Sequence, residues 1–220
     1  MTASITARQG FVGRLFESMK NNDKGRCVVL FLNKKKLFQL DRRLQTCASM
    51  VRENHVLADI GTDHAYLPIW LVKKEVIKKA IASDINMGPL QKAAFNIRRY
   101  NVGKQVDARL SDGLELIFPN EADDIVIAGM GELIADIIEK APWLKDAEKH
   151  LILQPMTSAP ELRTYLSEHG FAVKQEQAVQ DGDHIYTVMQ AEYDPEHVQT
   201  GQVFPYIGIL KADSDENKAY

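Results

Sequence analysis

Residues Leu57–Pro68 read Leu-Ala-Asp-Ile-Gly-Thr-Asp-His-Ala-Tyr-Leu-Pro, and this stretch decides the predicted fold. The apolar-biased run 56–60 predicts a short buried strand, which Gly61 ends. The polar residues 62–64 predict a tight turn, and the apolar pattern that starts at Tyr66 predicts a helix. In open α/β sheets, ligands bind at the carboxyl end of such a strand, over the N-terminus of the next helix.

The turn carries one glycine and two carboxylates, Asp59 and Asp63, rather than a glycine-rich phosphate cradle. Because carboxylates repel phosphates, this turn suits a ligand with ammonium, sulfonium or ribose hydroxyl groups. We therefore predict a nucleoside cofactor without phosphates, and S-adenosylmethionine fits best. A dehydrogenase is disfavoured because no Gly-x-Gly-x-x-Gly motif follows the first strand.

The composition is that of a soluble globular protein, with 45% hydrophobic and 26% charged residues. No apolar run approaches the roughly 20 residues of a membrane span, and residues 1–10 hold no apolar core, so we expect neither a membrane anchor nor a signal peptide. Two cysteines imply no disulfide framework, and a cytoplasmic setting is expected. No histidine pairs with a cysteine at zinc-ligand spacing, so no metal is predicted. The sequence predicts no particular oligomeric state.

Charge is distributed unevenly along the chain. Residues 1–55 carry 11 Lys and Arg against 4 Asp and Glu, whereas the whole chain has a net charge of −3. A basic N-terminal part on an acidic protein is compatible with a surface that binds a nucleic-acid backbone. The alternative is an ordinary solvated segment.

Apolar runs alternate between strand and helix spacing through most of the chain. They predict strands at 56–60, 79–84, 106–110, 124–128 and 150–154, and helices at 66–74, 88–100, 132–140 and 160–168. Gly103 is expected to end the second of these helices, and a short helix is expected after Asp112-Gly113. Two further strands, 171–179 and 184–192, are joined around Asp181-Gly182-Asp183 as a hairpin. The predicted fold is α/β, a Rossmann-like class I methyltransferase with a mostly parallel seven-stranded sheet and an antiparallel C-terminal hairpin.

An amphipathic helix is predicted before the first strand, because apolar residues recur at helical spacing from Leu37 to Val51. On its other faces, Arg42 and Arg43 are candidates for binding RNA phosphates, although such residues often only solvate a helix. We expect three regions: an N-terminal extension at 1–36, a Rossmann-like domain at 37–195, and a remnant of a helical region at 196–220.

Acidic residues recur at consecutive strand ends, where the fold predicts ligand contacts. Asp59 and Asp63 flank the first turn, and Asp84 ends the second strand, where it suits two ribose hydroxyls. Asp112 follows the third strand, where an adenine amino group needs an acceptor. A single such aspartate is more often a helix cap or turn former, but four in a row are harder to explain in that way.

Small residues follow the fourth strand, where Ala128-Gly129-Met130-Gly131 would let the backbone pass close to the methyl donor and the nucleophile. Met130 is a candidate wall of the target pocket, or plain core. His64 is expected to touch the cofactor or the target base, or only to make a local hydrogen bond. We predict Asp63, Gly129 and Met130 as the catalytic residues.

Several motifs resemble the bacterial tRNA (adenine(22)-N(1))-methyltransferase family over about residues 37–212. They are Leu44-Gln45-Thr46, the stretch Ala58–Pro68 quoted above, Asn86-Met87-Gly88-Pro89, Arg109–Leu114, Ile127–Gly131 and Leu151–Pro155. The resemblance implies S-adenosylmethionine as methyl donor and tRNA as acceptor. The cofactor contacts we expect are Asp59, Gly61, Thr62, Asp63, His64, Asp84, Ile85, Asp112, Gly113, Ala128, Gly129 and Gly131.

The sequence departs from that family at three places. The family usually has a second glycine where Glu132 follows Gly131, which predicts a shifted helix start. Met156 stands where the family tends to have an asparagine, so one polar contact to the base is missing. The family also carries a C-terminal helical coiled coil, whereas this chain stops at Tyr220. Alternative functions are a non-catalytic cofactor- or RNA-binding protein, or a methyltransferase for another substrate.

Overall fold

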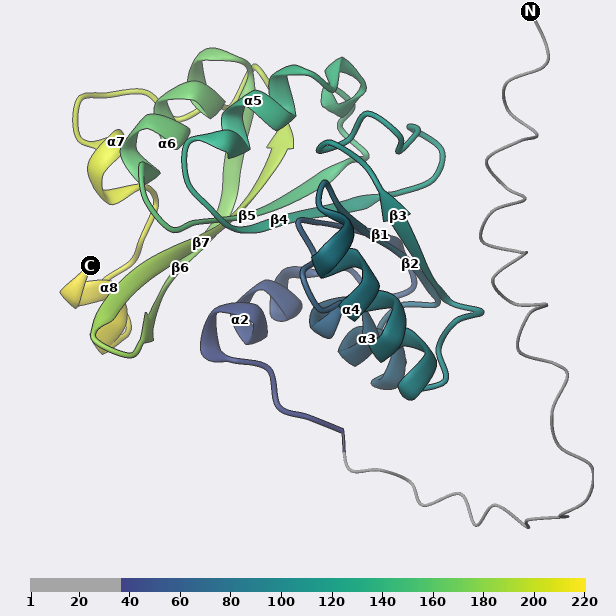
Figure 1. Cartoon of the computed structure of the whole chain (residues 1–220). Coiled ribbons are helices and arrows are strands. Elements are labelled where there is room, and N and C mark those ends of the chain that lie inside the picture. Colours follow the sequence, from purple (N-terminus) through teal and green to yellow (C-terminus); the bar gives the residue numbers. More distant parts are fainter. Residues whose placement is uncertain (1–36) are drawn as a thin grey trace, which may run out of the picture. The chain divides into compact units, whose positions relative to one another are not determined.

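The computed structural model describes residues 37–220, and its strands form one sheet. The strands are β1 (Val56–Ile60), β2 (Lys79–Asp84), β3 (Val106–Leu110), β4 (Asp124–Met130), β5 (His150–Pro155), β6 (Phe171–Asp181) and β7 (His184–Tyr193). Their order in the sheet is β3-β2-β1-β4-β5-β7-β6 (Figure 1). β1 to β5 pair in parallel, and β7 pairs antiparallel with both β5 and β6. The predicted mostly parallel sheet with an antiparallel hairpin is confirmed.

Helices cover both faces of this sheet (Figure 1). The helices are α2 (Arg42–Met50), α3 (Tyr66–Lys73), α4 (Met87–Arg99), α5 (Leu133–Glu139), α6 (Ala159–Glu168), α7 (Phe204–Ile207) and α8 (Asp215–Ala219), with a 3₁₀ turn at Pro142–Leu144. α2, α3 and α4 lie on one face, and α5 and α6 lie on the other (Figure 1). This is the layered arrangement expected when strands and helices alternate.

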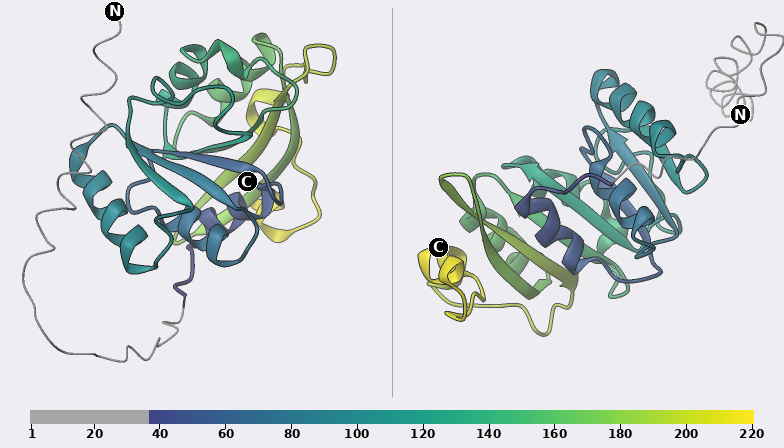
Figure 2. Two further views of the ribbon diagram at one scale, coloured as in Figure 1. Left: turned by 90° about the vertical axis from the view of Figure 1, so that its right-hand side faces the viewer. Right: turned by 90° about the horizontal axis from the view of Figure 1, so that it is seen from below.

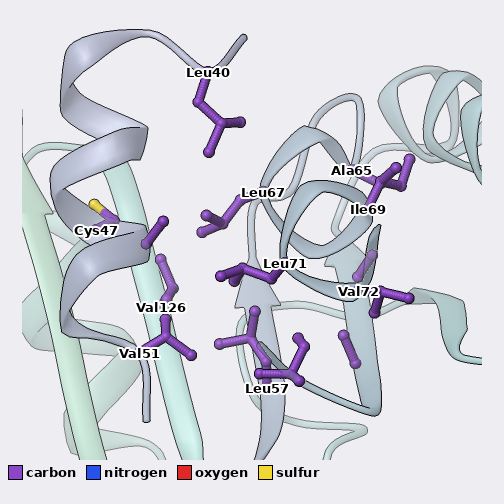
Figure 3. Packing of buried hydrophobic residues seen from close by; sticks show 14 of the residues in the cluster. Leu40, Cys47, Val51, Leu57, Ala65, Leu67, Ile69, Leu71, Val72 and Val126 are labelled. Carbon is purple, nitrogen blue, oxygen red and sulfur yellow. The ribbon is translucent and has the colours of Figure 1, made fainter. Parts of the chain in front are cut away.

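Two apolar clusters, one on each face, hold the layers together. In Figure 3, Cys47 of α2 and Leu71 of α3 meet Leu57 and Val126 of the sheet. Each of these four side chains has no solvent exposure. Burying one leucine-sized side chain stabilises the fold by about 1.5–3 kcal/mol. Burial also raises the pKa of the Cys47 thiol, so it packs as a neutral group.

The strand predictions hold, and the clearest cases are short runs of buried residues, as in β1 and β5. β1, β2 and β3 begin and end at the predicted residues. β4, β5, β6 and β7 begin as predicted but continue one or two residues further. α3, α5 and α6 agree with the predicted helices to within one residue at each end.

The first described helix is shorter than predicted. α2 begins at Arg42 rather than Leu37, because Asp41 takes an extended conformation and caps the helix. The Asp41 carboxylate accepts a hydrogen bond from the Leu44 amide at 2.8 Å. Leu40, which precedes the helix, is nevertheless only 5% exposed. The apolar residues before Arg42 therefore indicate contact with the core and not helical structure.

Two other local predictions are wrong. α4 ends at Arg99 through Asn101, which has a φ of 57°, and Gly103 takes no part in this left-handed turn. Asparagine tolerates that conformation, so the nearby glycine was a misleading signal. After Asp112-Gly113 the chain makes successive turns instead of a short helix, in which the Glu115 amide donates to Asp112 O at 3.1 Å.

The C-terminal segment, predicted as a remnant of a helical region at 196–220, contains the short helices α7 and α8 and folds back on the sheet. Arg163 of α6 and Glu176 of β6 form an ion pair at 2.7 Å, and both side chains are fully buried. Arg163 also donates to the Tyr220 hydroxyl at 3.0 Å. Asn217 of α8 accepts from the Ala178 amide at 2.8 Å, which covers part of the edge strand β6 (Figure 2).

The N-terminal extension predicted for residues 1–36 lies outside the described residues. Between residues 37 and 220, no helix is long and apolar enough to cross a membrane. In the same range, no group of three or more His, Cys, Asp or Glu residues is arranged to hold a metal ion.

Candidate functional site

The turn after β1 has an unusual backbone. Gly61, Asp63 and Ala65 all have positive φ, at 70°, 48° and 57°. Two of these residues carry a Cβ, and such conformations are retained where the surroundings enforce them. The Thr62 amide donates to Ser83 O of β2 at 2.8 Å, and Ala65 N donates back to Thr62 O at 3.0 Å. The turn is therefore held firmly at the sheet's carboxyl edge.

A second anchor comes from α4. The buried Asn96 side chain donates to His64 O at 3.0 Å. His64 stacks on Tyr66 with 5.2 Å between ring centroids, and its Nε2 lies 3.2 Å from the exposed carboxylate of Asp63. His64 thus does make local contacts, and it also faces the pocket described next.

A pocket of about 480 Å³ opens above the carboxyl ends of β1 and β4. Its floor is the turn after β1, and one wall is the end of β4. The lining residues are Asp41, Arg43, Leu44, Asp59, Gly61, Thr62, Asp63, His64, Tyr66, Leu67, Ala128, Gly129 and Met156. The structure therefore brings together all five cofactor contacts predicted from the first turn and two of those predicted from β4.

Asp59 is the buried acid of this pocket, at 5% exposure. Burial, with a smaller contribution from the Asp84 carboxylate, raises the pKa of its carboxyl group from 3.8 to about 6. A hydrogen bond from the Thr62 hydroxyl opposes the rise. A buried carboxyl group with a raised pKa is stabilised in its ionised form when a cation binds next to it. Asp59 is therefore well suited to a cationic ligand.

The remaining strand-end residues lie beside the pocket and not in its lining. Asp84 is 7% exposed, and its Oδ1 accepts from the Asn86 amide at 2.8 Å. The Ser111 amide donates to Asp84 O at 3.1 Å, so the ends of β2 and β3 are adjacent. Ile85 and Asp112 are exposed at these ends.

Gly113 has a packing role that its sequence did not reveal. A Cβ at this position would lie 3.1 Å from Ile137 Cγ1 of α5. Real Cβ atoms seldom approach a neighbour so closely. The close contact with α5 therefore explains the glycine independently of any ligand.

The end of β4 is irregular, and this irregularity shapes the pocket. A bulge between Ala128 and Met130 sets Gly129 out of register with β5, at a φ of 77°. The Met130 side chain packs over Gly61 and against the apolar cluster, outside the pocket lining. Met130 therefore packs against the first turn, outside the lining of this pocket.

Glu132, where the family usually has a second glycine, directly precedes α5. α5 begins at Leu133, one residue after the predicted Glu132. Gly131 lies under Thr157, whose Oγ1 would be 2.5 Å from a Cβ at this position. Met156 N donates to Met130 O at 2.7 Å, which ties the turn to β5.

The two arginines predicted to bind RNA have different surroundings. The Arg42 side chain is 58% exposed and pairs with Glu216 of α8 at 2.7 Å. The Arg43 side chain is 21% exposed, pairs with Asp181 at 2.7 Å, and lines the pocket. Only Arg42 has the exposure typical of a phosphate contact.

Sequence reasoning missed Gln154 of β5. Its side chain is fully buried, and Oε1 accepts from the Gly129 amide at 3.0 Å and from Arg43 Nη1 at 3.1 Å. The available signal was a polar residue at the end of an apolar strand, directly after Leu151-Ile152-Leu153. A buried amide of this kind needs hydrogen-bond partners, which here belong to the site.

Comparison with known proteins identifies the family. A methyltransferase domain model matches residues 40–189. The tRNA (adenine(22)-N(1))-methyltransferase of Bacillus subtilis is 38% identical over 155 residues. This match covers 70% of the chain but 65% of the relative, so the chain spans less than two thirds of that protein.

Solved structures agree with this comparison. The crystal structure of the B. subtilis M1A22 tRNA methyltransferase TrmK superposes with a TM-score of 0.69 at 38% identity, covering 73% of this chain and 69% of that one. A Streptococcus pneumoniae structure in complex with S-adenosyl-L-methionine gives a TM-score of 0.72 at 34% identity, covering 76% and 78%. The fold, the matched domain and these relatives show that the chain belongs to the tRNA (adenine(22)-N(1))-methyltransferase family.

Proposed function

We propose that this protein transfers a methyl group from S-adenosylmethionine to N1 of adenine 22 in tRNA. The observation that carries the proposal is the pocket between the ends of β1 and β4, lined by three carboxylates and by small residues. Membership of the family and the named activity of its B. subtilis member support the same reading. A cytoplasmic location and RNA binding belong to this proposal, because tRNA is the acceptor.

The residues present fit S-adenosylmethionine. When bound, this cofactor supplies a methyl group on a positively charged sulfur. Asp59 and Asp63 place negative charge at the pocket, where it favours a cation. Asp84 uses Oδ1 for the Asn86 amide, so we assign its Oδ2 to ribose hydroxyls. Ile85, Asp112 and Gly113 would flank the adenine at the ends of β2 and β3.

The chain's own contribution to the reaction is alignment. Adenine N1 has a lone pair, so no side chain has to remove a proton to create the nucleophile. Alignment of the base with the methyl group and exclusion of water then supply most of the acceleration. Gly129 leaves open space beside the pocket, since a Cβ there would meet nothing within 4 Å.

Charge develops on the acceptor during the reaction, because the methylated adenine is a cation. We assign the backbone carbonyls between Ala128 and Gly131, with the exposed Asp63 carboxylate, to hold the base and stabilise this charge. Asp63 is well placed for this role because it lines the pocket next to His64. Gly129 and Asp63 thereby remain proposed catalytic residues, whereas Met130 is assigned to support of the turn.

The tRNA must present adenine 22 outside its stack, as enzymes that modify bases require. Arg42 is the described residue that we assign to a phosphate, because its guanidinium is exposed on α2 beside the pocket-lining Arg43. Glu216 now pairs with Arg42 and would have to yield to the phosphate.

Methyl transfer to defined transcripts tests the proposal. Unmodified tRNA with adenine at position 22 is incubated with the protein and methyl-labelled S-adenosylmethionine, beside a transcript that differs only in having guanine there. We expect label in the adenine transcript and none above background in the guanine transcript. Equal labelling of the two transcripts, or none in either, would refute the proposed acceptor.

A further inference from the structure

The bulge at the end of β4 creates a backbone group that the sheet cannot satisfy. Gly129 lies between the paired residues Ala128 and Met130, so its amide has no partner in the β4–β5 ladder. The Gln154 side chain takes this role, with its Oε1 3.0 Å from the Gly129 nitrogen. The Gln154 Nε2 donates to Pro155 O at 2.9 Å, which fixes the orientation of the amide.

Arg43 is the second donor to the same oxygen. Its Nη1 lies 3.1 Å from Gln154 Oε1, while its Nε donates to Asp181 Oδ2 at 2.7 Å. The guanidinium carbon also lies 5.7 Å from the ring centroid of Tyr186. One side chain therefore joins α2, the end of β5 and the β6–β7 hairpin at the edge of the pocket.

We propose that Arg43 is a positioning residue for methyl transfer, which acts through Gln154 to hold the Gly129 backbone against the target base. The effect on methyl transfer rests on the proposed function. The hydrogen-bond network from Arg43 through Gln154 to Gly129 does not depend on it. The proposal replaces the prediction that Arg43 binds an RNA phosphate. For the exposed Arg42, we retain the prediction that it binds an RNA phosphate.

The charges around Arg43 agree with a positioning role. The reaction carries positive charge from the donor to the base, and an unpaired arginine beside the pocket would oppose a cation at either stage. Asp181 compensates the Arg43 charge at 2.7 Å, and its own side chain is 35% exposed. Asp41 also pairs with Arg43, with its Oδ2 3.4 Å from Nη2. Arg43 therefore supplies directed hydrogen bonds to the site without an uncompensated positive charge.

Lysine cannot reproduce this arrangement. Arg43 uses three different nitrogens of a rigid planar group: Nε for Asp181, Nη1 for Gln154 and Nη2 for Asp41. A lysine has one nitrogen on a flexible chain and would serve one acceptor well at most. The two roles therefore predict opposite results for Arg43→Lys. If Arg43 contacts a phosphate, lysine should keep that contact. If Arg43 joins Asp181 to Gln154, lysine should lose at least one of the two hydrogen bonds.

Steady-state methyl transfer separates these roles. We expect Arg43→Ala and Arg43→Lys each to lower kcat by about 10- to 100-fold, the range typical of one lost charged hydrogen bond. The KM for tRNA should change by less than about threefold, with its salt dependence retained. Lys104→Ala is the matched control, since it removes one exposed charge at the opposite end of the sheet. It should match the wild type.

A double variant tests whether Arg43 acts through Gln154. If it does, Arg43→Ala combined with Gln154→Ala should be no slower than the slower single variant. Fully additive losses would contradict this route. A raised KM for tRNA in Arg43→Ala, restored by Arg43→Lys at unchanged kcat, would overturn the proposal in favour of a phosphate contact.

Amide hydrogen exchange gives a readout that needs no activity. We expect the Gly129 amide to exchange at least tenfold faster in Arg43→Ala, while the buried Ile127 amide stays protected and reports an intact fold. Unchanged exchange at Gly129 would refute the inference. A wild-type protein that transfers no methyl group, but whose Gly129 exchange depends on Arg43, would support the network and refute the proposed function.

Discussion

Replacing Asp59 by asparagine should make the protein more stable at neutral pH and weaken its cofactor binding. Asparagine has nearly the shape of a protonated aspartic acid and carries no charge. Its side-chain oxygen can still accept from the Thr62 hydroxyl, as Asp59 does. The change therefore removes the cost of a buried charge while it keeps the local hydrogen bond.

The pKa of Asp59 sets the size and sign of the effect. It is 3.8 as a reference and about 6 in the fold, so the folded state holds the proton more tightly. Between these two pH values the folded state binds more protons than the unfolded state, and the free energy of unfolding falls as pH rises. A difference of about 2 pKa units corresponds to about 3 kcal/mol, expressed fully above pH 6 and absent below pH 3.8.

Urea unfolding from pH 4 to pH 8 measures this effect. We expect the variant's excess in unfolding free energy to grow from near zero at pH 4 to about 3 kcal/mol at pH 8. Glu53→Gln, at the opposite end of β1 and exposed, is the matched control and should show no such growth. An excess that is independent of pH, or an Asp59→Asn variant less stable throughout, would refute the reasoning.

The same variant should bind S-adenosylmethionine at least tenfold more weakly, measured by titration calorimetry at pH 8. A cation in the pocket favours ionised Asp59, so binding removes the cost that burial imposes. Ionised Asp59 would then lower the stability of the fold but strengthen cofactor binding, a trade-off that is common at active sites. Equal affinities in the two proteins would contradict the placement of the cofactor beside Asp59.

Two further substitutions test the packing around the site and the C-terminal segment. Gly61→Ala should destabilise the protein by more than Gly182→Ala: both take on about 1–2 kcal/mol of left-handed strain, but only Gly61 lies under Met130. Urea unfolding compares the two, and equal losses would count against the Met130 contact. Arg163→Met should lower the free energy of unfolding by about 3–5 kcal/mol because it leaves Glu176 buried without its partner. A loss below about 1 kcal/mol would show that the buried pair does not secure the C-terminal segment.

The sheet was predictable because strands such as β1 and β5 are short apolar runs that alternate with helical patterns. Strand pairing in an alternating α/β chain then follows from general rules of connection. Helix ends were less predictable, since Asp41 overrides the apolar spacing that begins at Leu37. Asn101 likewise takes the left-handed position that Gly103 suggested.

The part of the site formed by the turn after β1 was predictable from the sequence. Asp59, Gly61, Thr62, Asp63 and His64 are close in sequence, so the fold class alone brings them together. The contact of Arg43 with Gln154 and Asp181 joins residues more than 100 positions apart. Gln154 in turn accepts from the Gly129 amide, at a bulge in β4 that no local pattern indicates. Such contacts require the three-dimensional structure.

Methyl transfer by wild-type protein and by Asp63→Ala, measured side by side on unmodified tRNA, tests the central claim most directly. Glu53→Ala removes a carboxylate at the far end of β1 and serves as the matched control. We predict rapid labelling of the tRNA by the wild type and by Glu53→Ala, and at least a tenfold slower rate for Asp63→Ala. Equal rates in all three proteins would contradict a site at the turn after β1.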